Sequence, residues 1–148
     1  MKLRIVWIGK TKNPQLAKLC GDYISRIEHF LPLQVSEIKE PQGAVEAESK
    51  KILAELDASD RVIVLDPQGT PWTSEQLAKF VQQHMNSDPR RLTFVIGGYA
   101  GLSQSVKNDA DVLWSLSPLT FTHDLTRLLL LEQLYRALSI IHNLPYSK

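Results

Sequence analysis

Four consecutive leucines, Leu128 to Leu131, constrain the fold of this chain more than any other feature of its sequence. They lie in a predicted helix of about five turns, where successive side chains point in different directions, so no single face can hold all four. A helix that is apolar on every side is normally buried on every side. In a chain of 148 residues, we therefore expect this helix to pack against the body of the protein and also against another surface, such as a second copy of the chain.

Strand and helix patterns alternate along the whole length. Residues 61–65 (RVIVL) are β-branched and largely apolar, as the central strands of parallel sheets tend to be, and residues 92–96 (LTFVI) predict a second such strand. Helix starts are marked by Asn13-Pro14 and by a capping box formed by Thr73 and Gln76. The predicted strands are 3–8, 33–38, 61–65, 92–96 and 112–116, and the predicted helices are 14–29, 44–56, 73–85, 103–110 and 123–141. This alternation predicts one α/β domain, residues 1–148, with a mostly parallel sheet flanked by helices.

The composition is that of an ordinary globular protein, with 43% hydrophobic and 22% charged residues and a net charge of +1. The single cysteine, Cys20, excludes an internal disulfide and a cysteine-based zinc site, and we expect it to be a small buried side chain. The four histidines have no metal-ligand spacing, so no metal is predicted. No apolar run is long enough for a signal peptide or a membrane span, and we expect a cytoplasmic protein without a membrane partner.

The first 21 residues contain basic side chains and no acidic one: Lys2, Arg4, Lys10, Lys12 and Lys18. A basic segment can attract a polyanion such as RNA. An ordinary solvated surface explains the same charges equally well, so charge alone does not identify a partner.

Three predicted loops follow the carboxyl ends of strands, at residues 65–69, 97–101 and 115–122. If these strands are parallel neighbours, the loops converge at one edge of the sheet, where open α/β sheets commonly bind ligands. Glycines let backbone approach a ligand closely, which predicts a site built largely from backbone N–H and C=O groups. The GGYAG sequence is neither a dinucleotide fingerprint nor a P-loop, and a tight turn alone would also explain its glycines.

The last predicted helix carries polar residues within its apolar surroundings. His123 and Arg127 are four residues apart and share a face. A cation in the first turn opposes the helix dipole, so Arg127 has a reason to be there other than helix stability. Pairing with Asp124 is the alternative. Glu132 and Arg136 form a favourable pair four residues apart, which structure explains as well as function does.

Three blocks of sequence resemble the ribosomal large-subunit methyltransferase H family of the SPOUT class. They are LDPQGTPWTSEQLA (65–78), FVIGGYAGLS (94–103) and SLSPLTFTHDLTRLLLLEQLYRA (115–137), followed by Pro145-Tyr146. The resemblance implies S-adenosylmethionine as methyl donor and N3 of a pseudouridine in 23S rRNA of the ribosome as acceptor. It also implies a trefoil knot at the C-terminal end. The family is a homodimer in which the last helix contributes to the interface and the two subunits share the active site.

The same resemblance assigns roles to particular residues. Catalytic positions match His123 (base or positioning), Arg127 (phosphate or base-oxygen binding) and Tyr146 (near the acceptor). The cofactor-binding positions match Leu65, Gly97, Leu116, Ser117, Pro118, Leu119, Thr120 and Phe121.

Two positions depart from the family pattern. The family usually ends in Pro-Tyr-His, where this chain has Ser147, and proline usually precedes the histidine, where this chain has Thr122. Serine cannot replace a histidine that recognises the base or moves a proton. An alternative is therefore an S-adenosylmethionine-binding homodimer with an altered RNA target or lost activity. A third reading is a flavodoxin-like nucleotide or phosphate binder.

Overall fold

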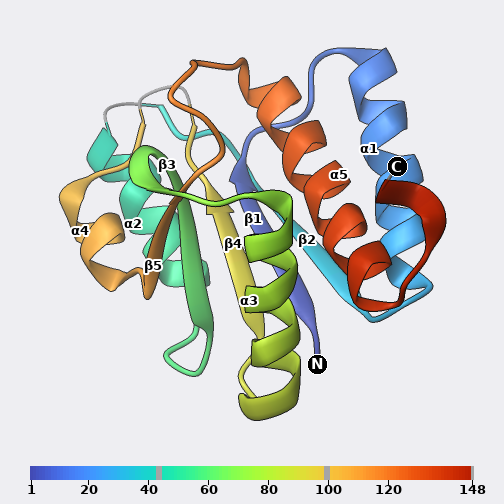
Figure 1. Ribbon diagram of the computed structural model, residues 1–148. Coiled ribbons are helices and arrows are strands. Elements are labelled where there is room, and N and C mark those ends of the chain that lie inside the picture. The colour runs from blue at the N-terminus through green and yellow to red at the C-terminus, as the bar shows by residue number, and fades with distance from the viewer. Residues whose placement is uncertain (43–44, 99–100, 148) are drawn as a thin grey trace.

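Five parallel strands form the centre of the computed structural model, which describes residues 1–42, 45–98 and 101–147 (Figure 1). Within these residues the strand order is β2-β1-β4-β3-β5, and every pairing is parallel. The strands are β1 (Leu3–Ile8), β2 (Leu33–Ile38), β3 (Arg61–Pro71), β4 (Leu92–Ile96) and β5 (Val112–Ser115). The predicted parallel α/β fold is confirmed.

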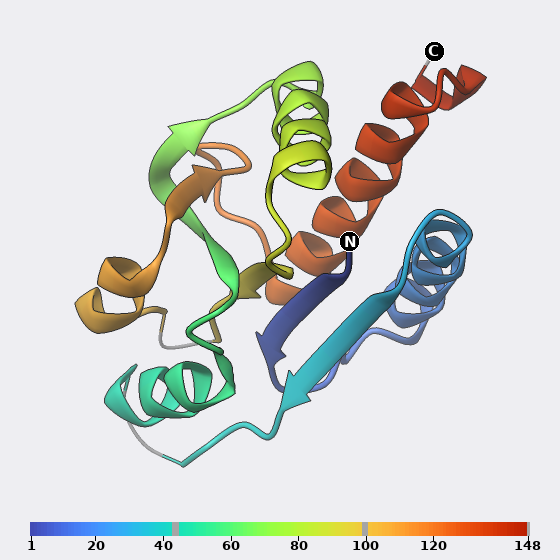
Figure 2. The same ribbon diagram turned by 90° about the horizontal axis from the view of Figure 1, so that it is seen from below.

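Helices cover both faces of the sheet (Figures 1 and 2). They are α1 (Pro14–Glu28), α2 (Val45–Glu55), α3 (Ser74–Ser87), α4 (Gln104–Asp109) and α5 (His123–Ile141), with a 3-10 helix η1 at Pro145–Ser147. The core is accordingly in two parts. Alternate residues of a strand face opposite sides, so Leu3, Ile5 and Trp7 of β1 pack with α1, α3 and α5, whereas Val6 and Ile8 pack with α2 and α4.

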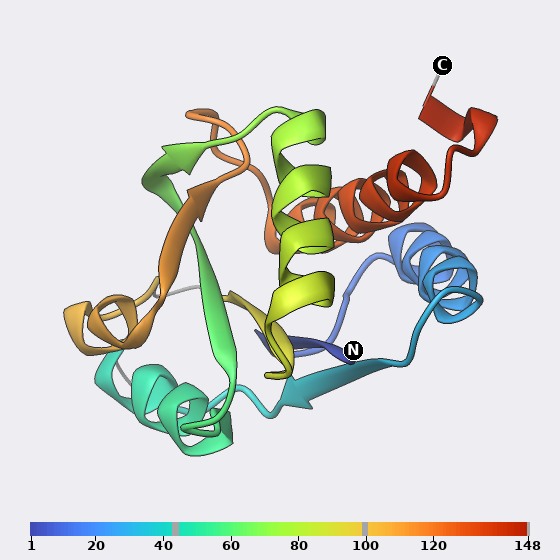
Figure 3. The same cartoon turned by 60° about the horizontal axis from the view of Figure 1, so that its bottom comes forward.

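Helix α5 lies between α1 and α3 (Figure 3). Every one of its residues is buried or half-buried, as its apolar sequence predicts. Its fully buried side chains include Leu130, Leu131 and Leu134. Half-buried Leu125 and Leu129 are among the described hydrophobic side chains that join neither part of the core. The implied C-terminal knot stays a prediction.

Strand β3 differs from the sequence prediction, which ended it at Leu65 and placed a turn at residues 66–69. The strand continues to Pro71, and both Leu65 and Thr70 pair with Trp114 of β5, so the four residues between them leave the ladder. We call residues 66–69 the β3 bulge. A Cβ atom at Gly69 would lie 2.6 Å from the carbonyl carbon of Leu113, so the bulge can press against β5 only because this residue has no side chain.

The C-terminal segment was predicted to be a tail, but the described part of it, residues 143–147, is folded. Asn143 has a φ of 56°, a left-handed conformation that asparagine tolerates, and the Leu144 N–H then donates to Ser139 O at 2.8 Å. The chain turns back on α5, and η1 sets Tyr146 beside Glu132 of that helix, with their side chains 3.1 Å apart.

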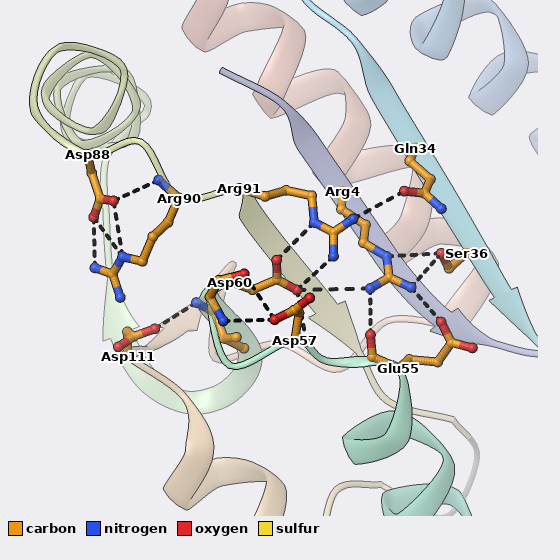
Figure 4. A network of polar contacts seen from close by, with 12 residues as sticks. Arg4, Gln34, Ser36, Glu55, Asp57, Asp60, Asp88, Arg90, Arg91 and Asp111 are labelled. Atoms are coloured by element: carbon orange, nitrogen blue, oxygen red, sulfur yellow. Dashed lines mark hydrogen bonds and ion pairs between the residues drawn. The ribbon is translucent and has the colours of Figure 1, made fainter.

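A buried ion-pair network closes the sheet at the amino ends of the strands, away from the predicted ligand loops (Figure 4). Arg4 donates to the Glu55 carbonyl oxygen at 2.6 Å and to Ser36 Oγ. Asp60 accepts two hydrogen bonds from Arg91, at 2.9 and 3.1 Å. One of the basic side chains near the N-terminus is therefore used inside the protein.

We expect Asp60→Asn to lower the free energy of unfolding by about 3 kcal/mol, because it leaves the buried Arg4 and the half-buried Arg91 without their shared carboxylate. Asp60 is only 5% exposed and lies within reach of both Arg4 and Arg91. Urea denaturation measures the change, and Asp22→Asn, an exposed position on α1, is the matched control. A loss no greater than that of the control would show that the network contributes little.

Candidate active site

The three ligand loops converge, as expected for the carboxyl ends of neighbouring parallel strands. A pocket of about 480 Å³ lies between them. Seven of the eight residues expected to bind a cofactor line it, and Pro118 is the exception: the seven are Leu65, Gly97, Leu116, Ser117, Leu119, Thr120 and Phe121. His123 lines the same pocket. Its volume is in the usual range for a small-molecule site, roughly 300–1,000 Å³.

The glycine loop after β4 is held close to its neighbours. A Cβ atom at Gly97 would lie 2.7 Å from Leu102 Cγ, and Leu102 itself lines the pocket. The Gly101 N–H donates to Gly98 O at 3.0 Å, and the Ser103 N–H donates to Ser49 Oγ of α2 at 3.2 Å. Tyr99 and Ala100, the middle of the predicted loop, lie outside the described residues.

The loop between β5 and α5 forms the other wall. Ser117 Oγ accepts the N–H of Leu119 at 3.0 Å, which fixes a turn. Thr122 is the N-cap of α5 and its hydroxyl accepts the Leu125 N–H at 3.2 Å. Leu119 is 67% exposed although it lines the pocket. At the position where the family usually has proline, this chain therefore has a threonine whose side chain caps the helix.

Sequence reasoning missed two charged residues of the pocket, Asp66 and Lys107. Lys107 Nζ of α4 lies 2.8 Å from Asp66 Oδ2 of the β3 bulge. Burial pushes the pKa of Asp66 up, but hydrogen bonds from Lys107 and from the Gln68 N–H outweigh it and the pKa is lowered. Asp66 is therefore ionised near neutral pH. Its place at the end of a strand was a usable signal, whereas nothing in the sequence pairs it with Lys107.

A second pocket, of about 400 Å³, adjoins the first through His123. It is lined by the end of β1 and the loop after it, by Glu40 after β2 and by the start of α5: Ile8, Gly9, Lys10, Lys12, Glu40, Thr122, His123, Asp124 and Arg127. Asp124 Oδ2 accepts the backbone N–H groups of Lys12 and Asn13 at 3.0 and 2.8 Å, so α5 holds this loop in place.

His123 is half-buried at the first position of α5, between the two pockets. Burial, followed by the positive charge of Arg127, lowers the pKa of His123 below its ordinary value of 6.5. The imidazole is therefore neutral at pH 7. A neutral imidazole has one ring nitrogen free to accept a proton or a hydrogen bond.

Arg127 lies inside the protein, only 2% exposed. Its guanidinium donates to Ile8 O at 2.6 Å and to Thr11 Oγ1 at 3.1 Å, and it lies over the Trp7 ring. The contact with Asp124 offered as the alternative is longer, at 4.0 Å. Its Nε has no partner among the described residues. Arg127 thus braces the β1–α1 loop and also contributes to the wall of the second pocket.

Tyr146 is not near His123 within one chain. It lies beside the carboxyl half of α5, where Arg136 stacks over its ring at 5.1 Å and its hydroxyl is 2.7 Å from that of Tyr23. Burial and the hydrogen bond with Tyr23 raise the pKa of Tyr146. From His123 to Arg136 the helix rises about 20 Å. The structure therefore brings His123 and Arg127 together and leaves Tyr146 apart from them.

Cys20 and the Glu132–Arg136 pair have structural roles. Cys20 is buried, as predicted, and the Glu132–Arg136 pair forms at 2.5 Å. Within residues 1–42, 45–98 and 101–147, no group of three His, Cys, Asp or Glu side chains is arranged to hold a metal ion. Nor does any helix described here have the length and apolar character needed to cross a membrane.

Comparison with known proteins adds a family to this geometry. A family model described as "Predicted SPOUT methyltransferase" matches residues 1–147. The chain is 38% identical to ribosomal RNA large subunit methyltransferase H of Trichlorobacter lovleyi, covering 99% of both chains. It is 41% identical to the protein of the same name from Maridesulfovibrio salexigens, covering 98% of this chain and 97% of the relative.

A solved structure supports the fold alone. The crystal structure of a probable methyltransferase from Bordetella pertussis Tohama I superposes with a TM-score of 0.54 over 92% of this chain and 93% of that one, at 12% identity.

Proposed function

The chain belongs to the ribosomal RNA large subunit methyltransferase H family of SPOUT methyltransferases, and we propose that it transfers a methyl group from S-adenosylmethionine to N3 of a pseudouridine in 23S rRNA. The observation that carries this proposal is that one pocket is lined by seven of the eight residues expected to bind the cofactor. A ribosomal substrate also implies a cytoplasmic location.

The residues of the first pocket suit S-adenosylmethionine. Apolar side chains such as Leu65, Ile96 and Leu116 can cover an adenine ring. The glycines leave the N–H and C=O groups of the protein backbone accessible to the ring. The hydroxyl groups of Ser117 and Thr120 in the same lining suit the hydroxyls of the ribose. The narrow space at Gly97, which a Cβ atom would already fill, is consistent with close backbone contact.

When bound, S-adenosylmethionine supplies a methyl group on a positively charged sulfur. The acceptor N3 gains this methyl group as the carbon–sulfur bond breaks, and the N3 proton passes to a general base or to water. We assign the handling of this proton to a ring nitrogen of His123, which lines both pockets and is neutral at pH 7. The second pocket, with Lys10 and Lys12 at its rim, is then the place for the acceptor nucleotide.

A homodimer would complete the site. Tyr146 lies at the opposite end of α5 from His123, and a two-fold axis through the middle of this helix would set Tyr146 of one copy beside His123 of the other. The half-buried Leu125 and Leu129 on α5 support such an interface. So do Leu19 and Leu144, which are 43% and 41% exposed.

The test is a methylation assay on 70S ribosomes, and on their separated subunits, from cells that lack this modification. We expect one methyl group per large subunit at N3 of pseudouridine, located by mass spectrometry of the digested rRNA. Binding of S-adenosylmethionine without transfer to any of these substrates would instead support the binding protein suggested by Ser147. Failure to bind the cofactor at all would favour the nucleotide or phosphate binder.

We expect the methylation rate to fall as the pH drops below 6.5, because protonated His123 cannot accept a proton. Burial and the charge of Arg127 lower the pKa of His123, so this fall in rate lies below the ordinary histidine pKa of 6.5. The unfolded chain binds this proton more tightly than the folded protein does, so the free energy of unfolding also falls below pH 6.5. Thermal unfolding at each pH separates the two effects. An acid limb that is unchanged in the residual activity of His123→Gln would argue against this role.

A further inference from the structure

The ion pair between Asp66 and Lys107 has no part in the chemistry assigned above, although it lies in the cofactor pocket. Lys107 Nζ is 2.8 Å from Asp66 Oδ2, and Asp66 Oδ1 accepts the Gln68 N–H at 2.8 Å. Asp66 is only 8% exposed. Among the described residues that line this pocket, no other Asp, Glu, Lys or Arg occurs.

Both charged groups can bind further partners. The Lys107 ammonium has three N–H donors, and Asp66 receives one of them. The Asp66 carboxylate accepts two hydrogen bonds in the described structure and has room for about two more. An ion pair kept at the wall of a pocket with unused donors and acceptors is suited to a ligand that carries both charges.

The pair and His123 approach the pocket from different sides. Lys107 belongs to α4, whose Val106 packs on the face of the sheet shared with α2. His123 begins α5, which packs on the other face. Asp66 is the first residue of the β3 bulge. The charged pair is thus placed away from the helix that carries the acceptor side of the site.

We infer that Asp66 and Lys107 bind the amino-acid end of the cofactor, with the Lys107 ammonium receiving its α-carboxylate and the Asp66 carboxylate receiving its α-ammonium group. This assignment rests on the proposed function, since it requires an S-adenosyl ligand. A zwitterion set against the ion pair satisfies all four charges and adds no net charge to a partly buried site. Adenine and ribose are neutral, so they offer no anion to the two Lys107 N–H donors that Asp66 does not use.

Two ligands that differ only at this end test the inference. S-adenosylhomocysteine has the amino and carboxylate groups, whereas 5′-methylthioadenosine keeps the adenosine and the sulfur but lacks both. We expect Lys107→Met to weaken S-adenosylhomocysteine binding about tenfold to a hundredfold in calorimetry. Binding of 5′-methylthioadenosine should stay within about twofold of the wild type, since it makes no contact with the ammonium.

A second variant covers the risk that Lys107→Met leaves Asp66 as an unpaired buried charge and disturbs folding. The double variant Asp66→Asn/Lys107→Met carries neither charge, and we expect it to weaken S-adenosylhomocysteine binding relative to 5′-methylthioadenosine binding at least as much as Lys107→Met does. Lys79→Met, at an exposed position on α3, is the control and should bind both ligands as the wild type does.

The outcomes separate this inference from the function it rests on. An equal loss of affinity for both ligands would overturn it, because the pair would then shape the pocket or bind the ribose. Unchanged affinity for both would overturn it too. If the wild-type protein bound 5′-methylthioadenosine as tightly as S-adenosylhomocysteine, the amino-acid end would have no subsite here, while cofactor binding would stand. If the wild type bound neither ligand, the proposed function itself would fail.

Discussion

A mixture of two inactive variants, His123→Ala and Tyr146→Phe, is expected to regain methylation activity when their subunits are allowed to form mixed dimers. Each variant alone should lose about a hundredfold or more in rate, because each removes a group from every site. In a mixed dimer with shared sites, one site carries both changes and the other carries none. Random pairing of equal amounts then restores about a quarter of the wild-type activity.

The experiment is run by unfolding and refolding the two variants together and assaying 70S ribosomes. Tyr23→Phe is the matched control, because it removes the hydrogen bond between the Tyr23 and Tyr146 hydroxyls but keeps the hydroxyl of Tyr146. We expect it to stay active. Equal damage from both phenylalanine variants would mean that Tyr146 serves the structure at the end of α5. Absence of any recovery in the refolded mixture would mean that each site is complete within one chain.

Gly97→Val is expected to reduce the affinity for S-adenosylmethionine by about a hundredfold or more, which corresponds to roughly 3 kcal/mol. The first carbon of any side chain there would lie 2.7 Å from Leu102 Cγ and 2.9 Å from its Cδ2. Leu102 must then move into the pocket that it lines, or the glycine loop must move away from the cofactor. Either movement removes close backbone contacts.

Calorimetry with S-adenosylmethionine measures this effect, and circular dichroism shows whether the variant is folded. Gly21→Ala is the control, because a Cβ atom at this position in α1 meets nothing within 4 Å. We expect it to bind normally and to be slightly more stable, since alanine favours a helix over glycine. Wild-type affinity in a folded Gly97→Val protein would contradict the three-loop site.

The sheet and its helices could be predicted from sequence because their signals are local. β1 and β4 consist mainly of apolar residues and occur at the predicted bounds, and Thr73 with Gln76 forms the expected capping box. The continuation of β3 could not be predicted, since it depends on Gly69 resting against the backbone of β5, a contact between segments far apart in the chain.

The candidate site likewise has features that could be predicted from the sequence and features that could not. Strand ends are local, and parallel pairing brings them together, so the pocket follows from the order of the elements. The direction of a long side chain is not local. Arg127 was expected to face a ligand, but it also finds acceptors at Ile8 and Thr11, more than a hundred residues earlier in the chain. The position of Tyr146 depends on the reversal at Asn143, which no periodic pattern reveals.

The β3 bulge also bears on how a ligand can reach and leave the pocket. The residues on either side of it, Leu65 and Thr70, both pair with Trp114, so the sheet restrains movement of this wall. The opposite wall, residues 116–122, has no ladder partner in the described structure and carries the exposed Leu119. We therefore expect that second wall to control the exchange of methyl donor and spent product, and substitutions at Leu119 to change the rate of this exchange.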